Sequence, residues 1–140
     1  MADERLSQLS IVIYDGHYDK IHYALAMASS AAAIDTSVTL FFTMDACRAL
    51  MKSGWRDLPV SQGSGNGGTM DDDFAAQKIA TFDELLSACI EFGVTIMVCE
   101  MGLKARGLDA GDLRDDIPVT SGGLVTFLSN ASASGSVVFI

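Results

Sequence analysis

The chain has 140 residues, of which 49% are hydrophobic and 19% are charged, and its net charge is −9. This length corresponds to one domain spanning residues 1–140, and so much apolar sequence with only two prolines excludes an intrinsically disordered chain. No cluster of Lys or Arg offsets the acidic excess. The composition therefore excludes nucleic acid as a primary ligand and argues against binding to an anionic membrane surface.

The N-terminal sequence and the cysteines predict a cytoplasmic protein. Acidic residues follow Met1 where a secretory signal needs a basic segment and then an apolar one. The longest charge-free stretch, Ile117–Ile140, is interrupted by Pro118 and several glycines, so we expect no membrane span there. Three cysteines without CxxC spacing indicate neither a disulfide framework nor a zinc site, and we expect no metal and no cofactor.

The first part of the chain predicts alternating strands and helices. Ser10–Tyr14 is a short β-branched run typical of a buried strand, and Asp19–Ile34 carries apolar residues at helical spacing. Ser37–Phe42 is the second predicted strand. Asp45 is expected to cap a following helix over Ala46–Lys52.

The alternation continues to the end of the chain. Gln62–Met70 is rich in glycine and is predicted to be a mobile surface loop that folding does not require. Thr81 and Glu84 match a capping box that opens a helix ending at Gly93. The remaining predicted elements are strands at Val94–Val98, near Val119 and at Ser136–Ile140, and helices at Asp109–Leu113 and Gly122–Ala133.

Continuous apolar strands separated by helices are typical of a parallel sheet covered on both faces. We therefore expect a three-layer α/β domain of about five mostly parallel strands in a flavodoxin-like arrangement, with the first strand between the second and third. Reactive groups gather outside the carboxyl ends of such strands. In this order Cys47 and Cys99 start roughly 10 Å apart at ~4.8 Å per strand, beyond the roughly 7 Å Cα limit for a disulfide.

Cys99 is the candidate nucleophile at this edge, because it directly follows the predicted strand Val94–Val98. A helical turn over Met101–Arg106 would aim free N–H groups at the sulfur and favour the thiolate. The alternative is that Cys99 is a small buried hydrophobe. Cys89 lies in the middle of an apolar helix face and is expected in the core. Cys47 has either a redox or relay role or an ordinary role in helix packing.

Other residues expected at the same edge could assist. His17 could act as an acid or base, or as a partner of the thiol, against the alternative of a solvent-exposed turn histidine. Lys20 and Asp45 are candidates because of their position at the edge. Gly122 and Gly123 precede a helix and could bind a small anion through backbone N–H groups. The sequence lacks the GxSxG, P-loop and GxGxxG patterns of serine hydrolases and nucleotide-binding proteins.

Three segments carry a resemblance to a known family. Tyr14–Lys20 and Val38–Thr43 resemble the opening of DsrE/DsrF-like proteins, and Phe92–Met101 resembles the strand and cysteine of that family. The resemblance extends through the closing strand. It implies sulfur carriers or sulfurtransferases that hold sulfane sulfur on the residue matching Cys99. It also implies TusA-like or other sulfur-carrier partners and homo-oligomers from trimers to hexamers.

The sequence departs from the family pattern after the cysteine. Gly102 stands where the family has Ser, and Leu103 and Arg106 stand where it has Met. These departures predict a different sulfur donor or a loss of transfer activity. Three functions stay open: a sulfur carrier or sulfurtransferase using Cys99, a non-catalytic oligomeric module that binds a small ligand, and a thiol peroxidase or disulfide reductase.

Overall fold

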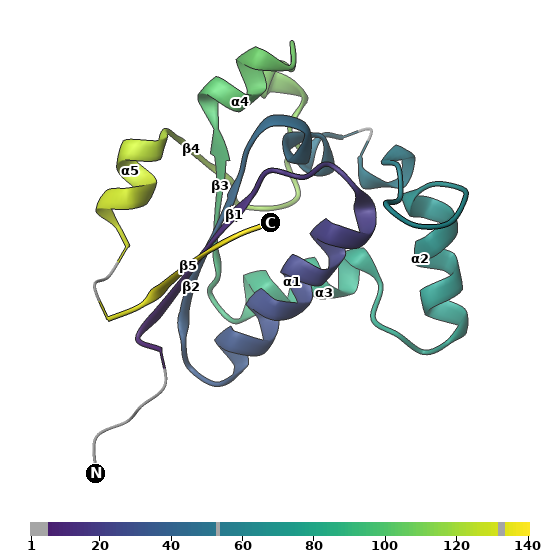
Figure 1. Cartoon of the computed structure of the whole chain (residues 1–140), viewed down its shortest axis with the longest axis horizontal. Helices are drawn as coiled ribbons and strands as arrows, with labels where there is room; N and C mark the ends of the chain where they lie inside the picture. Colours follow the sequence, from purple (N-terminus) through teal and green to yellow (C-terminus); the bar gives the residue numbers. More distant parts are fainter. Residues whose placement is uncertain (1–5, 53, 132–133) are drawn as a thin grey trace.

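Strands from the whole length of the chain build one parallel sheet (Figure 1). The computed structural model describes residues 6–52, 54–131 and 134–140. The strands are β1 (Gln8–Ile13), β2 (Ser37–Phe42), β3 (Thr95–Cys99), β4 (Thr120–Gly122) and β5 (Ser136–Phe139). The α-helices are α1 (Tyr18–Ala33), α2 (Gly67–Ala76), α3 (Phe82–Glu91), α4 (Glu100–Ala105) and α5 (Leu124–Ser129). Short 3-10 helices are η1 (Met44–Leu50), η2 (Trp55–Asp57) and η3 (Ala110–Asp112).

The strand order is β4-β3-β2-β1-β5, and every neighbouring pair is parallel. The predicted α/β class with about five parallel strands is therefore confirmed. The flavodoxin-like order is wrong. That order would place β1 between β2 and β3, whereas in the structure β2 lies between β1 and β3. Cys47 lies in η1, which follows β2, and Cys99 ends β3, so the two cysteines lie at the ends of adjacent strands. The predicted spacing of two strands between them is also wrong.

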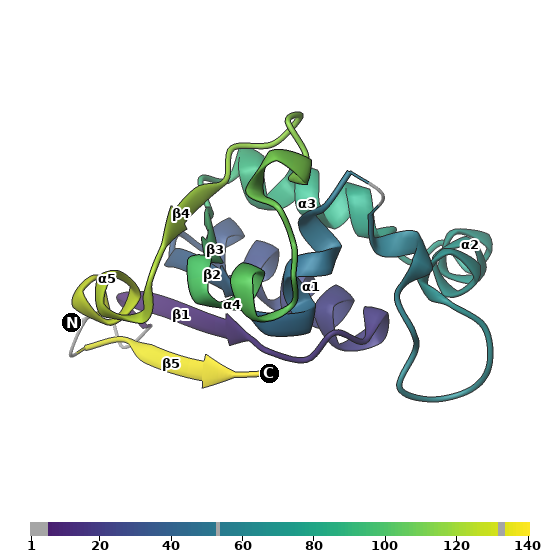
Figure 2. The same cartoon turned by 90° about the horizontal axis from the view of Figure 1, so that it is seen from above.

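The direction of the crossovers decides which face of the sheet each helix covers. Parallel crossovers are right-handed. The connections from β1 to β2 and from β2 to β3 run in the same direction and place α1 and α3 on one face. The connection from β4 to β5 returns across the whole sheet, so α5 lies on the opposite face (Figure 2). We call these two surfaces of the sheet the α1–α3 face and the α5 face.

The α1–α3 face carries the larger core. Alternate strand residues point to it and are buried beneath the two helices. These residues are Leu9, Ile11, Ile13, Val38, Leu40, Phe42, Ile96 and Val98. The helices contribute Ile21 and Leu25 from α1, and Phe82 and Leu86 from α3. This face is therefore packed along the length of the three central strands.

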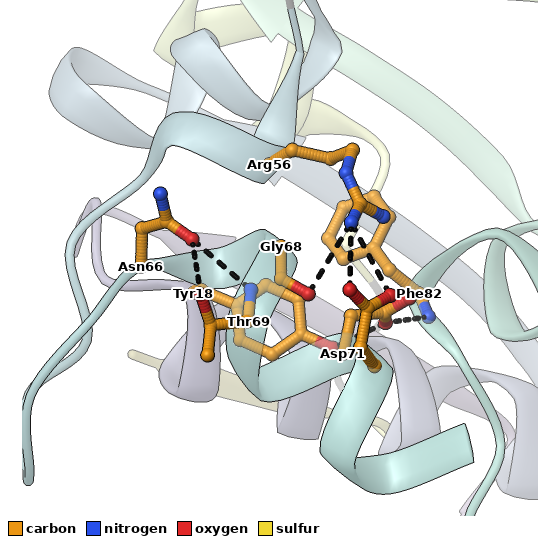
Figure 3. A network of polar contacts seen from close by, with 8 residues as sticks. Tyr18, Arg56, Asn66, Gly68, Thr69, Asp71 and Phe82 are labelled. Carbon is orange, nitrogen blue, oxygen red and sulfur yellow. Dashed lines mark hydrogen bonds and ion pairs between the residues drawn. The ribbon is translucent and has the colours of Figure 1, made fainter. Parts of the chain in front are cut away.

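A buried carboxylate joins α1, α2 and α3 at the edge of this core (Figure 3). Asp71 of α2 accepts a 2.5 Å hydrogen bond from the hydroxyl of Tyr18 in α1. It also accepts a 2.7 Å bond from the backbone N–H of Phe82, the first residue of α3. Burial, together with the bond to Asp71, holds the pKa of Tyr18 well above its ordinary value. The hydroxyl therefore stays protonated and keeps donating to the carboxylate.

The prediction of a mobile loop over Gln62–Met70 is wrong for its second half. Helix α2 begins at Gly67, and the side chain of Asn66 caps it by accepting a 3.0 Å bond from the Thr69 N–H. Gly67 is buried, and a Cβ atom there would lie 2.4 Å from the carbonyl oxygen of Trp55. Close packing therefore requires glycine at position 67, so the glycines of this segment do not all indicate mobility.

Of the remaining local predictions, some are confirmed and others are wrong. The capping box is confirmed, since the Thr81 hydroxyl accepts from the Glu84 N–H and the Glu84 carboxylate accepts from the Thr81 N–H. Residues 44–50 form a 3-10 helix whose N-cap is Thr43, so the predicted α-helix over Ala46–Lys52 and its cap Asp45 are wrong. Helix α5 ends at Ser129, and the last two residues of the helix predicted there, 132–133, lie outside the described residues. Within the described ranges, no helix is both long and apolar enough to cross a membrane.

Candidate functional site

Cys99 lies where strand β3 passes into helix α4. It is the last residue of β3 and the N-cap of α4, and its Sγ accepts a 3.4 Å hydrogen bond from the Gly102 N–H. The helical turn predicted after the cysteine is therefore present. This hydrogen bond fixes the orientation of the sulfur at the start of α4. The residue is only 1% exposed.

Gly102 allows α4 to approach the start of η1. A Cβ atom on Gly102 would lie 2.5 Å from the Met44 backbone nitrogen and 2.8 Å from the Thr43 Oγ1. The serine that the family resemblance leads one to expect at this position would collide with both. Met44 has φ of 51°, in the left-handed region that side chains other than glycine rarely adopt. The close approach holds the ends of β2 and β3 together beside Cys99.

A second, smaller apolar cluster contains Cys99. It lies on the α5 face and includes Val12, Phe41 and Met97 of the sheet, together with Phe127 of α5. The rings of Phe41 and Phe127 stack with their centroids 4.9 Å apart and an interplanar angle of 29°. Cys99 is therefore part of the layer between the sheet and α5.

The two glycines predicted to bind a ligand border this cluster. Gly122 is the Cα partner of Cys99 in the β3–β4 pairing, and a Cβ atom there would lie 2.9 Å from the Met97 Cε. Gly122 thus leaves room for the Met97 side chain. Gly123 is exposed and is the N-cap of α5, with no atom within 4 Å of where its Cβ would be.

Two pairs of polar side chains lie side by side at the carboxyl ends of β1 and β2. The His17 Nδ1 is 2.6 Å from the Asp15 Oδ1, and the His17 backbone N–H donates to the same oxygen at 2.8 Å. Partial burial raises the pKa of Asp15, but the hydrogen bonds from His17 outweigh it and hold that pKa below its ordinary value. The Arg106 Nε donates to the Asp45 Oδ1 at 2.8 Å. A Cβ on Gly16 would lie 2.5 Å from the Asp45 Cβ, so the two pairs adjoin.

The sheet edge therefore collects the predicted residues, but their polar atoms are engaged with other partners. The hydrogen bonds of His17 and Asp45 run to Asp15 and to arginines, not to the sulfur of Cys99. Lys20 is exposed on α1, and its charge contributes to lowering the pKa of Asp15. An assisting role for these groups stays a prediction.

The other two cysteines are buried among core residues of the α1–α3 face. The Cys47 Sγ donates to the carbonyl oxygen of Phe42, and the Cys89 Sγ donates to that of Leu25, each at 3.6 Å. Burial, together with the nearby thiol of Cys99, raises the pKa of Cys47 to about 12. Burial alone raises the pKa of Cys89 to about 12. Both stay protonated at neutral pH, and the prediction that Cys89 is a core residue is confirmed.

Sequence reasoning missed Phe41 and Phe127 as neighbours of the site. Alternation within Ser37–Phe42 could have assigned Phe41 to the opposite face from Phe42. It could not have found Phe127, because that contact depends on which strand α5 follows and where that strand pairs.

A separate cavity of about 420 Å³ is lined by Trp55, Asp83 and Arg114, among others, and its lining does not include Cys99. Arg114 bonds to Asp83 and to Asp116 within its wall. Its charge is thereby neutralised by these two carboxylates.

Known proteins show similarity over almost the whole chain. The model of the DsrE/DsrF-like family matches residues 8–139. The uncharacterized protein YrkE of Bacillus subtilis (strain 168) is 27% identical over 162 residues, which cover 98% of this chain and 99% of YrkE.

Two solved structures share the fold at low sequence identity. The ychN protein from E. coli superposes with a TM-score of 0.58 at 17% identity, covering 95% of this chain and 99% of ychN. MTH1491 from Methanobacterium thermoautotrophicum, described as a protein of unknown function, gives 0.56 at 14% identity and covers 95% and 98%. The match of the family model over nearly all of the chain is decisive: the chain belongs to the DsrE/DsrF-like family.

Proposed function

We propose that the protein holds sulfane sulfur on Cys99 and passes it to the thiol of an acceptor, acting as a sulfur carrier or sulfurtransferase. The observation that carries the proposal is the contrast among the three thiols. Cys99 lies at the carboxyl end of a strand and its Sγ accepts from a backbone N–H, whereas the Sγ atoms of Cys47 and Cys89 donate to carbonyl oxygens within the core of the α1–α3 face. Membership of the family supports the same assignment.

The transfer needs one cysteine and no net oxidation. The Cys99 thiolate attacks the outer sulfur of a persulfide donor, a new S–S bond forms, and the donor's S–S bond breaks to release a thiolate. With thiosulfate the leaving group is sulfite, and with tetrathionate the cysteine gains a thiosulfonate group while thiosulfate leaves. The acceptor thiolate then attacks the outer sulfur and releases Cys99 as its thiolate.

Two side chains at this edge of the sheet fit assisting roles in this proposal. His17, oriented by Asp15, is suited to protonate the leaving thiolate. Arg106, tied to Asp45, supplies positive charge at the C-cap of α4, seven residues after the cysteine. The acceptor is a TusA-like or other sulfur-carrier protein.

Intact-mass measurement tests the proposal. Reduced protein is incubated separately with polysulfide, tetrathionate and thiosulfate, and we expect a mass gain that dithiothreitol removes. The Cys99→Ser variant should gain no mass and should keep its circular dichroism spectrum. Cys89→Ala is the matched control and should gain mass like the unmodified chain. Failure to gain mass with every donor would contradict the proposal.

We also propose that the protein is a homo-oligomer assembled along the edge of the sheet that β5 forms. Large apolar side chains are exposed on this strand. They are Val137 and Phe139, and the Phe139 ring, which is 70% exposed, lies beside Tyr14 with the ring centroids 5.8 Å apart. Exposed apolar groups gathered in this way mark contact surfaces. Light scattering coupled to size exclusion should give a mass of three to six chains, and a monomer at micromolar concentration would contradict this proposal.

A further inference from the structure

The burial of Cys99 poses a problem for any reaction at its sulfur. The residue is 1% exposed, and it shares a cluster with Val12, Phe41, Met97 and Phe127. An attacking thiolate must reach the outer sulfur of a donor in line with the bond that breaks. Some part of the surroundings of Cys99 therefore has to move before a donor or an acceptor can approach.

Most of the surroundings are fixed in place. Phe41 and Met97 are paired residues of the two central strands β2 and β3, so their backbones are held by the sheet. Helix α4 is held against η1 by the close approach of Gly102 to Met44. A movement of either would break strand pairing or open the tight contact between α4 and η1.

Helix α5 is held much more weakly. It has six residues, and Phe127 is the one that is buried, whereas the other five are exposed. Its N-cap, Gly123, has open space around it and follows directly on Gly122, the strand partner of Cys99. The helix therefore begins beside the cysteine and is attached to the sheet face through a single ring, which stacks on Phe41.

We propose that α5 is a movable cover over Cys99 and that Phe127 is the anchor that keeps it closed. Local opening of short, weakly packed elements costs far less than global unfolding. When the Phe127 ring leaves Phe41, the apolar floor of the cluster and the sulfur become accessible from the α5 side. The movement of α5 does not depend on the proposed function. Its role, which is to control when sulfur is loaded and released, rests on that function.

The rate of alkylation by iodoacetamide tests the cover without any sulfur transfer. The folded protein is labelled at neutral pH, and peptide mass analysis follows Cys99 and Cys89 separately. Phe127→Ala should raise the rate at Cys99 by at least ~10-fold, because the closed state loses its anchor. The rate at Cys89 should stay unchanged, which separates local opening from global unfolding.

Phe92→Ala is the matched control. It removes the same ring at a 52% exposed position at the C-cap of α3, outside the buried cluster of Cys99. Its rate at Cys99 should equal that of the unmodified chain. If Phe127→Ala fails to fold, Phe127→Leu serves instead and should give a smaller increase.

Two results would overturn the cover. One is a rate at Cys99 that Phe127→Ala leaves unchanged or that Phe92→Ala raises equally. The other is a rise at Cys99 and Cys89 together. Faster alkylation in Phe127→Ala without any sulfur gain in the unmodified chain would leave the cover standing and remove the proposed function. Sulfur gain in the unmodified chain without faster alkylation in Phe127→Ala would leave the proposed function standing and remove the cover.

Discussion

The two faces of the sheet are built from the same strands but are covered very differently. On the α1–α3 face, two helices bury alternate residues of the three central strands, and aromatic rings from η2 and α3 add to the core. On the α5 face, one helix of six residues places one buried ring over the sheet. The strand order explains the difference, because one short return crossover has to cover the whole second face.

This contrast separates the stability of the fold from the reactivity of the site. Cys89 and Cys47 belong to the thick face, where burial holds their thiols protonated. Cys99 belongs to the thin face, where the groups around its sulfur include a weakly anchored helix. The fold can therefore open near one cysteine without exposing the other two.

The largest expected effect compares one buried ring from each face. Phe82→Ala should lower the free energy of unfolding by about 3–5 kcal/mol, because it leaves a cavity between Trp55 and Tyr18. Phe127→Ala should cost only about 1–2 kcal/mol, because α5 can detach while the rest stays folded. Urea unfolding followed by circular dichroism measures both. Equal losses would show that the two faces contribute alike and would break the comparison.

A smaller effect is expected at two glycines near the cysteine. Gly102→Ala should cost about 1–3 kcal/mol, since its Cβ would lie 2.5 Å from the Met44 backbone nitrogen and would push α4 away. Gly123→Ala should change the free energy of unfolding by less than about 0.5 kcal/mol, because nothing lies near its Cβ position. Thermal melts of the two variants check this. A tolerated Gly102→Ala would mean that α4, too, is loosely held.

The smallest effect is a pH dependence from a buried thiol. Burial raises the pKa of Cys89 to about 12 in the folded protein, against an ordinary value near 9. Its contribution to stability is therefore complete below pH 9 and is lost as pH rises toward 12. Between pH 9 and 10 the loss is about 1 kcal/mol for this one thiol. Urea titrations at pH 9 and pH 10 measure the fall in the free energy of unfolding between these two values. This fall should be smaller in Cys89→Ala than in the unmodified chain by about 1 kcal/mol. An equal fall in the two proteins would contradict the raised pKa of Cys89 in the folded state.

Local patterns in the sequence predicted the elements that depend on neighbouring residues. The Thr81–Glu84 capping box and the strand ending at Cys99 are both present, because capping and strand propensity act over a few positions. The strand order was not predicted, since it depends on how crossovers fit together over the whole chain. As a result the closeness of the ends of β2 and β3 was missed.

Two further errors come from reading composition without packing. The sequence predicts that the glycines near Asn66 are mobile. Gly67, however, packs so close to the carbonyl oxygen of Trp55 that there is no room for a Cβ atom. A buried Cys99 was one of the two alternatives for this residue, and its 1% exposure agrees with that alternative. Its packing in one cluster with Phe127 could not be predicted, because the two residues are joined only through the pairing of β3 with β4.

The most direct test of the central claim is to locate the added sulfur by peptide mapping after loading with polysulfide. The comparison uses the unmodified chain and a Cys47→Ser, Cys89→Ala double variant in which Cys99 is the remaining cysteine. We predict that the extra sulfur is found on the peptide containing Cys99 in both proteins, and that an added acceptor thiol removes it. Sulfur mapped to Cys47 in the unmodified chain, or no loading of the double variant, would contradict the account.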